Sequence, residues 1–241
     1  MKAILLAAGR GTRISKFIKE IPKSTLPVKD EKSLIRTTVE TMLQKGIQPV
    51  VCVGFKYDHI YKALEGLPVQ YYYNPFYAVT NSIASLWFAK DEIDDDLIVM
   101  NADVFFSDEI LDNLINNPNE VVLVSDKSRV KEGDYFFKLN KDNRVIRYGK
   151  DIPLEDRSCE YVGMAKISKS FAPKFKERLE TLIDNQEYSA WWENVLYSFT
   201  DEKTELISTM DIDGCFWSEI DFLDDYERIL HYVGSENHIT E

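Results

Sequence analysis

The sequence predicts an α/β fold built on a mostly parallel sheet with helices on its faces. Four apolar runs of strand length occur in the first hundred residues, at 3–8, 49–53, 69–73 and 97–100. Segments with helical periodicity lie between them, at 33–44, 57–64 and 82–89. Strands that alternate with helices are typical of a doubly wound sheet, in which ligands bind at the carboxyl ends of the strands.

After about residue 120 the pattern changes to shorter strands with polar turns. VVLVSD, DYFFKLN and NRVIRYGKD each predict a strand, and residues 140–143 predict a hairpin turn. We therefore expect a small antiparallel addition to the sheet. Two helices at 169–184 and 189–199, a strand near 215–220 and a helix from about 221 to 233 complete the prediction. We find no linker or internal repeat, and expect one domain over residues 1–241.

Composition and charge limit the classes of function. The chain of 241 residues is 44% hydrophobic and 29% charged, which is typical of a folded globular protein. Its formal net charge of -12 argues against nucleic acid as a partner, because binding to a phosphate backbone needs a positive surface. No segment approaches the roughly 20 apolar residues of a membrane span. We expect a cytoplasmic protein with no membrane partner, and the sequence is compatible with a homo-oligomer.

The stretch LLAAGRGTR, residues 5–13, follows the first predicted strand and contains two glycines. A glycine-rich loop there is compatible with a steric turn, a dinucleotide cradle or a triphosphate cradle. The third glycine of a dinucleotide motif and the Gly-Lys-Ser/Thr of a Walker loop are both missing. Close approach of backbone N–H groups to phosphates is possible at Ala7, Ala8, Gly9 and Gly11, with Thr12 adding a hydroxyl and Arg13 and Lys23 adding cations.

Three carboxylates predict a metal site. Asp103 ends the apolar strand in VMNADVFF and so lies at the carboxyl edge of the sheet. Glu219 and Asp221, in FWSEIDF, are two positions apart and share one face of a strand. Asp103 alone is also compatible with a turn or a helix cap, and Glu219 and Asp221 alone are ordinary acidic residues. Together they offer the hard oxygen ligands that Mg²⁺ prefers, and we expect Mg²⁺ as the cofactor.

LLAAGRGTR followed by IPKSTLPV resembles the signature of nucleotidyltransferases that activate sugar phosphates and phospho-alcohols with NTP. The order of glycine loop, Pro-Lys, strand-end Asp and late Glu-x-Asp is also similar, over nearly the full chain. The segment 73–93, YNPFYAVTNSIASLWFAKDEI, is more similar to bacterial CTP:phosphocholine cytidylyltransferases than to the sugar-phosphate branch. RISKFIKEIPK departs from the usual Leu-x-Pro-Leu-Thr pattern before Pro-Lys.

This resemblance implies a Rossmann-like sheet of the nucleotide-diphospho-sugar transferase type. It implies that the half at about 1–120 binds CTP and the half at about 121–241 binds the phospho-alcohol acceptor. The implied nucleotide contacts are Leu6, Ala7, Ala8, Gly9, Gly11, Arg13 and Asn81, with Lys23 catalytic and Mg²⁺ on Asp103 and Asp221. Lys150, in YGKDIP, falls where relatives place a lysine that contacts the acceptor phosphate.

Aromatic residues are the candidates for recognition of the acceptor. Aromatic faces attract quaternary ammonium groups, although aromatics at helical spacing more often fill cores. The candidates for a choline cage are Tyr77, Trp87, Trp191, Trp192 and Trp217, with Glu193 as a negative charge. Because Trp191 and Trp192 are adjacent on a predicted helix, they point about 100° apart, and we expect one of them to line a pocket.

Two further functions stay open at this point. A sugar-1-phosphate nucleotidyltransferase would use the same loop and carboxylates, and relatives act on other small acceptors such as inositol phosphate. A non-catalytic nucleotide sensor could keep the fold, although we would then expect the loss of Arg13, Lys23 or Asp103, and all three are present. We predict transfer of CMP from CTP to a phospho-alcohol, most favourably phosphocholine.

Overall fold

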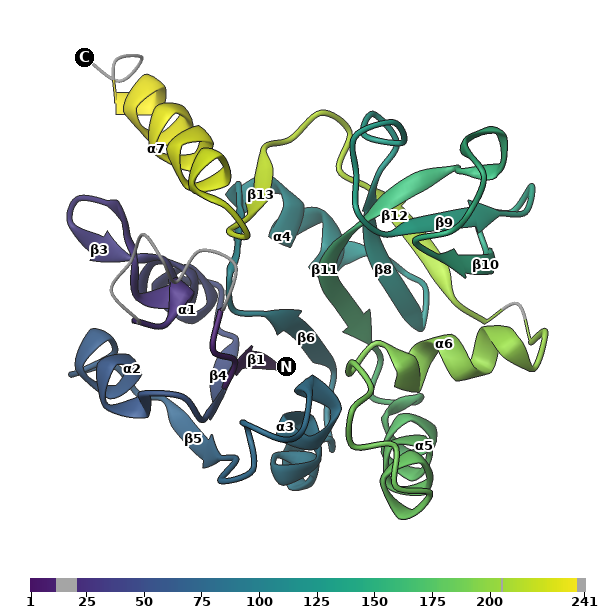
Figure 1. The fold of residues 1–241 in the computed structure, drawn as a ribbon, viewed down its shortest axis with the longest axis horizontal. Coiled ribbons are helices and arrows are strands. Elements are labelled where there is room, and N and C mark those ends of the chain that lie inside the picture. Colours follow the sequence, from purple (N-terminus) through teal and green to yellow (C-terminus); the bar gives the residue numbers. More distant parts are fainter. Residues whose placement is uncertain (12–20, 205, 238–241) are drawn as a thin grey trace.

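The computed structural model describes residues 1–11, 21–204 and 206–237 of the chain. Nine strands form its main sheet: β1 (Lys2–Ala7), β4 (Gln48–Val53), β5 (Gln70–Tyr73), β6 (Leu97–Asn101), β8 (Val121–Asp126), β9 (Phe136–Leu139), β10 (Val145–Gly149), β11 (Cys159–Ile167) and β12 (Ser208–Asp211). Their order is β10-β9-β11-β6-β1-β4-β5, with β8 pairing with β11 and β12 (Figure 1). The sheet thus joins strands from both halves of the chain.

The parallel part of the sheet agrees with the prediction. β6, β1, β4 and β5 are neighbours and all run parallel, and they match the four strands predicted in the first hundred residues. Along β1, Ala3 and Leu5 enter the core on one face while Ile4 enters the core on the other, and all three are fully buried. Burial on both faces explains why this strand is a continuous apolar run rather than an alternating one.

The antiparallel part was predicted only in part. The hairpin of β9 and β10 forms as expected, and its turn places Asn143 at a φ of +55°. β11, which pairs antiparallel with β6 and β8, was not predicted. Its sequence, CEYVGMAKI, contains Glu160 and Lys166, which break the apolar pattern although both are buried. Each has a polar partner, since Arg129 forms an ion pair with Glu160 and the Lys166 ammonium donates a hydrogen bond to the Asn117 carbonyl.

Helices cover both faces of the sheet. They are α1 (Leu34–Gln44), α2 (Tyr57–Ala63), α3 (Ser82–Phe88), α4 (Asp108–Asn116), α5 (Ala172–Asp184), α6 (Asn194–Asp201) and α7 (Leu223–Asn237), with 3-10 turns η1 (Lys23–Thr25), η2 (Lys90–Glu92) and η3 (Leu154–Asp156). α4 and β12 were missed, and α6 begins five residues later than predicted, because residues 189–193 form turns instead of a helical start. Within the described ranges, no helix has the length and apolar character needed to cross a membrane.

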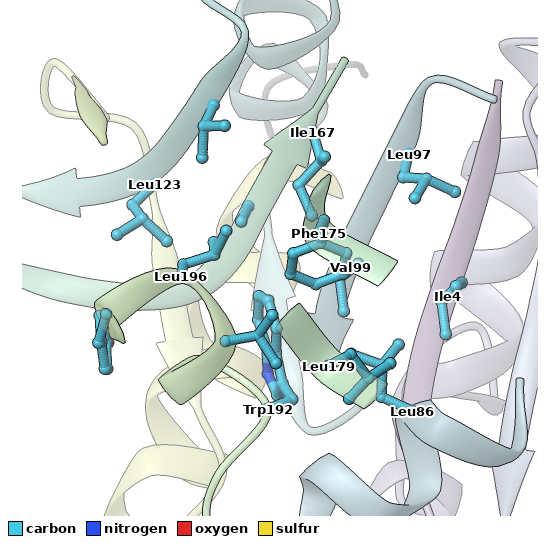
Figure 2. Close-up of a cluster of buried hydrophobic side chains, with 14 of the residues drawn as sticks. Ile4, Leu86, Leu97, Val99, Leu123, Ile167, Phe175, Leu179, Trp192 and Leu196 are labelled. Carbon is cyan, nitrogen blue, oxygen red and sulfur yellow. The ribbon is translucent and has the colours of Figure 1, made fainter. Parts of the chain in front are cut away.

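Two main cores lie on opposite faces of the sheet. In the first, side chains of α3, α5 and α6 pack on β1 and β6, with Leu86, Phe175 and Trp192 at the centre (Figure 2). The second contains buried residues of α1, α2 and α4. A third, smaller core joins α7 to β2 (Pro27–Lys29) and the start of α1. These layers leave the carboxyl ends of β1 and β6 uncovered.

A separate two-stranded sheet brings the end of the chain back to this edge. β7 (Val104–Phe106) pairs antiparallel with β13 (Trp217–Glu219), which places Val104 opposite Glu219. The Ile220 N–H also donates to the Asp103 carbonyl at 2.9 Å. A second small sheet pairs β2 with β3 (Lys32–Ser33). The β7–β13 pair is the element that carries residues 219–221 to the strand ends.

Candidate active site

A cavity of about 290 Å³ opens at the carboxyl ends of β1 and β6. This is the edge at which ligands bind in open α/β sheets. It is lined by Leu6, Ala8, Gly9, Tyr77, Thr80, Asn81, Ser82, Ser85, Asn101, Asp103, Asp134, Tyr135, Lys150, Glu160, Tyr161, Gly163, Trp191, Glu193, Tyr197, Glu219 and Asp221.

Three carboxylates meet at one wall of this cavity. One oxygen each of Asp103, Glu219 and Asp221 lies within 4.8 Å of the others. Burial raises the pKa of Glu219 well above its usual range, and the negative charges of Asp103 and Asp221 add to this effect. Three crowded carboxylates repel one another unless a cation lies among them. The set therefore has the chemistry of a site for a hard divalent cation.

Lys23 supplies a positive charge to the same group. Its Nζ lies 2.5 Å from Asp221 Oδ1 and 3.5 Å from Asp103 Oδ2. Burial alone would lower the pKa of Lys23, but the two carboxylates outweigh it and raise the pKa above its ordinary value. Lys23 is therefore a fixed cation beside the carboxylates, at the start of η1 directly after Pro22.

The glycine loop lies against Lys23. Gly11 has a φ of +59°, and a Cβ there would lie 2.7 Å from Lys23 Cγ. Leu6, Ala7, Gly9 and Gly11 line a smaller space of about 70 Å³ together with Lys23 and Asp103. The loop thus borders both the carboxylates and the main cavity. Thr12 and Arg13, predicted to face the same phosphates, lie outside the described residues.

Asn81 and Ser82 join α3 to the segment before α6. The Asn81 side chain caps α3 by accepting from the Ser82 N–H at 2.8 Å, and Ser82 Oγ accepts the Trp192 N–H at 2.9 Å. Asn81 is exposed and lines the cavity, and its Nδ2 donates to the Ser189 carbonyl at 3.3 Å. Its amide is therefore held in one orientation beside the loop.

Glu193 is a buried carboxylate at the cavity. Burial raises its pKa to about 7, although the Asn101 side chain, which donates to it at 3.4 Å, acts in the opposite direction. The negative charge of Asp103 raises the pKa further. A cation that enters the cavity would favour the ionised form of Glu193.

Aromatic side chains form the wall beside Glu193. Tyr135 stacks on Tyr197 with ring centroids 5.6 Å apart, and it meets Trp191 edge to face at the same separation. Tyr161 completes this wall. Trp191 was predicted from the sequence, but the three tyrosines were not: Tyr135 directly precedes β9, Tyr161 lies in β11 and Tyr197 lies in α6. DYFFKLN was recognised only as a strand, and nothing in its pattern marked Tyr135 as a wall of the site.

Three of the predicted cage residues do not reach the cavity. Trp192 is fully buried and donates from Nε1 to Asn101 Oδ1 at 3.0 Å, so it positions a cavity residue from behind. Trp217 is buried in the opposite core and donates to Asp126. Trp87 packs on the first core with the Lys90 ammonium over its ring. The predicted helix through Trp191 and Trp192 is also wrong, because α6 begins at Asn194.

Lys150 and Tyr77 do line the cavity. Lys150 Nζ pairs with Asp134 Oδ2 at 2.6 Å and lies 5.7 Å from the centre of the Trp191 ring. The Asp134 N–H in turn donates to Glu160. Lys150 is half-exposed at the mouth of the site, which leaves its charge accessible to an anionic group.

This fold and this site define a class. A glycine loop at a strand end, a largely buried lysine and three clustered carboxylates lie together at the carboxyl edge of the sheet, and the chain is an enzyme of the nucleotidyltransferase class. Residues 3–191 match the family model of the MobA-like NTP transferase domain, and the chain belongs to this family.

Similar proteins cover almost the whole chain. CTP:phosphoglutamine cytidylyltransferase of Campylobacter jejuni is 29% identical over 94% of this chain and 98% of its own length. Choline-phosphate cytidylyltransferase of Streptococcus pneumoniae is 25% identical over 98% of this chain and 100% of its own length.

Solved structures share the fold. CTP:phosphocholine cytidylyltransferase of Streptococcus pneumoniae has a TM-score of 0.73 and 21% identity, over 96% of this chain and 98% of that one. Inositol-1-phosphate CTP transferase of T. maritima has a TM-score of 0.75 and 20% identity, over 96% of this chain and 95% of that one. The mixed, mostly parallel sheet is thus the nucleotide-diphospho-sugar transferase fold that the sequence predicted.

Proposed function

We propose that this chain transfers CMP from CTP to phosphocholine and releases pyrophosphate. The observation that carries the proposal is the pairing, in one cavity, of the Lys23 and carboxylate cluster with an aromatic wall around the buried Glu193. The full-length relatives named for CTP support the choice of nucleotide.

The reaction needs positioning more than acid–base chemistry. An oxygen of the acceptor phosphate forms a bond to the α-phosphorus of CTP, the bond to the bridging oxygen breaks, and pyrophosphate departs with its electron pair. Because the acceptor is already an anion, no general base is required. Lys23 neutralises charge on the phosphates, and Arg13 is proposed to do the same.

The carboxylates fit a resident Mg²⁺. Their donor set is made only of oxygens, and a cation, Lys23, already lies against two of them. We propose that Asp103 and Asp221 hold Mg²⁺, with Glu219 beside them, and the ion would supply a positive charge that orients the phosphate oxygens. The peptide loop of residues 6–11 then cradles the triphosphate, and Asn81 borders the nucleoside.

Recognition of the acceptor is proposed to rest on charge and aromatic faces. Glu193 supplies a negative charge that burial would otherwise keep half protonated near pH 7. Trp191, Tyr135 and Tyr197 supply faces for a trimethylammonium group, worth roughly 0.5 to 2 kcal/mol for each good contact. Lys150, at the mouth, is proposed to contact the acceptor phosphate.

Pyrophosphate release tests the proposal. Four NTPs are each combined with phosphocholine, phosphoglutamine, inositol phosphate and glucose-1-phosphate in the presence of Mg²⁺. We expect turnover with CTP and phosphocholine. Turnover only with a hexose phosphate would assign the chain to the sugar-1-phosphate branch instead, and nucleotide binding without turnover across the panel would favour a sensor.

Two variants test the aromatic wall separately from the nucleotide site. Trp191→Ala is expected to raise the KM for phosphocholine about ten-fold, as expected for the loss of one or two cation-π contacts, and to leave the KM for CTP unchanged. Trp87→Ala is the matched control, because Trp87 lies outside the cavity. Equal effects of both variants on the KM for phosphocholine would contradict the proposed wall.

A further inference from the structure

A second cavity, of about 630 Å³, lies away from the candidate active site and shares no lining residue with it. Residues from the start of α4, the end of β8, the segment before β13 and α7 line it. A volume of this size accommodates a small organic molecule. Nothing in the proposed nucleotidyl transfer uses it.

Two arginines face this cavity from different elements. Arg129 follows β8 and pairs through Nε with Glu160 at 2.9 Å, whereas Arg228 comes from α7 and donates from Nη2 to Ser218 Oγ at 2.7 Å. Over the described part of the chain, Arg228 Nε has no hydrogen-bond partner. Burial and the nearby charge of Arg129 lower the pKa of Arg228. Two guanidinium groups that repel each other gain stability from an anion between them.

Ser107 adds a third donor. It is 7% exposed, lines the cavity, and its hydroxyl has no partner among the residues that the structure describes. Ser107 is the N-cap residue of α4, but its side chain makes no capping bond. The N-terminus of α4, which carries the positive end of the helix dipole, therefore begins at this cavity beside a buried hydroxyl without a partner among the described residues.

Nearby carboxylates offset the charge of these arginines only in part: Glu160 pairs with Arg129, and the pKa of Arg228 stays lowered although Asp225, Glu160 and Asp126 act to raise it. Of the carboxylates that line the cavity, Asp126 is the buried one, and its oxygens already accept from Trp217 Nε1 at 2.8 Å and from the Ser128 backbone and hydroxyl. Glu109 and Asp213 are exposed at the rim, where water screens them. A cation would find no vacant buried oxygen of Asp126, whereas an anion finds three donors.

We propose that this cavity binds the phosphate group of a small phosphorylated molecule, through Arg129, Arg228 and Ser107. Guanidinium groups match the geometry of phosphate oxygens. The cavity is larger than a phosphate needs, and Phe216 and Tyr232, stacked at 4.1 Å, present an aromatic surface inside it. In a phosphate ester with a flat ring, the phosphate would bind the arginines and the ring would lie against the aromatic surface.

Calorimetric titration of the whole chain tests this site. The probes are inorganic phosphate and phenyl phosphate, at low ionic strength with EDTA. We expect one site per chain, weakened at least about ten-fold by Arg228→Gln and about five-fold by Ser107→Ala. Tighter binding of phenyl phosphate would identify an aromatic ester as the ligand, and equal binding would identify inorganic phosphate.

Two controls separate this cavity from the active site and from general charge. Lys23→Ala removes the cation of the active site and is expected to leave the titration unchanged. Arg147→Gln removes an exposed arginine of β10 and is expected to do the same. If Arg228→Gln does not fold, as judged by thermal melting, Ser107→Ala carries the test. Absence of binding, or loss of binding in Lys23→Ala with retention in Arg228→Gln, would overturn the proposal.

Discussion

The buried carboxyl of Glu193 makes stability depend on pH in a direction opposite to that of most acidic groups. Its pKa is raised from 4.5 to about 7 in the folded chain by burial, which the hydrogen bond from Asn101 only partly offsets. Between these two values the folded state binds more protons than the unfolded state. Stability from this group is therefore present below pH 4.5 and is lost as the pH rises toward 7.

The size of this effect follows from the same two values. Each pH unit between the folded and unfolded pKa corresponds to about 1.4 kcal/mol, so the full contribution is about 3 kcal/mol. Between pH 5 and pH 8, about 2.5 kcal/mol of it should be lost. Glu193→Gln keeps the shape and the hydrogen-bonding capacity of the side chain and removes its titration.

The measurement is urea unfolding of the wild type and Glu193→Gln in EDTA at four pH values from 5 to 8. We expect the variant to gain stability relative to the wild type by about 2.5 kcal/mol over this range. Glu187→Gln, at an exposed position nearby, controls for the loss of a surface carboxylate. A difference between wild type and Glu193→Gln that stays within about 0.5 kcal/mol at every pH would refute the burial argument.

Three further outcomes test the site and its support. Asp103→Asn is expected to lower kcat for pyrophosphate release on the order of 10²-fold or more, as for other groups that stabilise transferred charge. Gly11→Ala should cost about 1 kcal/mol in the free energy of unfolding, because its φ is positive and its Cβ would meet a neighbouring side chain at 2.7 Å. Trp192→Ala should cost about 3 to 5 kcal/mol in urea unfolding, whereas Trp191→Ala, at a position 41% exposed, should cost less than about 1 kcal/mol.

Each of these outcomes has its own control. Asp213→Asn changes an exposed carboxylate in a turn and should leave kcat unchanged. Gly46→Ala shares a positive φ but has no atom within 4 Å of the added Cβ, so it isolates the backbone effect from the clash. Equal losses of stability for the two tryptophan variants would contradict the division between core and cavity wall.

The sequence predicted the parallel part of the fold well because the physical signal is local. β1 and β4 are buried on both faces, so each is a continuous apolar run that ends in small or polar residues. β11 carries no such signal. Its Glu160 and Lys166 find polar partners in residues distant in sequence, and its Gly163, with φ of +91°, allows close approach to Val104. Tertiary contacts compensate each irregularity, and a single sequence does not reveal them.

The carboxylates could be predicted because each lies at a strand end, and strand ends share an edge. Asp103 follows β6, while Glu219 and Asp221 are carried to it by the pairing of β7 with β13. The aromatic wall of the cavity could not be predicted in this way. Tyr135 directly precedes β9, Tyr161 lies in β11 and Tyr197 lies in α6, and the Tyr161 N–H donates to the Tyr135 carbonyl, so the wall depends on β11, the strand that the sequence did not reveal.

The two adjacent tryptophans show how the same wall is held in place. The prediction that only one of them faces a pocket assumed a helix, yet residues 189–193 form turns. The division arises instead from two hydrogen bonds of Trp192, whose backbone donates to Ser82 and whose indole donates to Asn101. Asn101 also donates to Glu193, so a buried indole that does not line the cavity holds the amide that contacts the cavity carboxylate. In the proposed mechanism, variation at the exposed Trp191 would therefore alter the choice of acceptor while Trp192 keeps the geometry of the site.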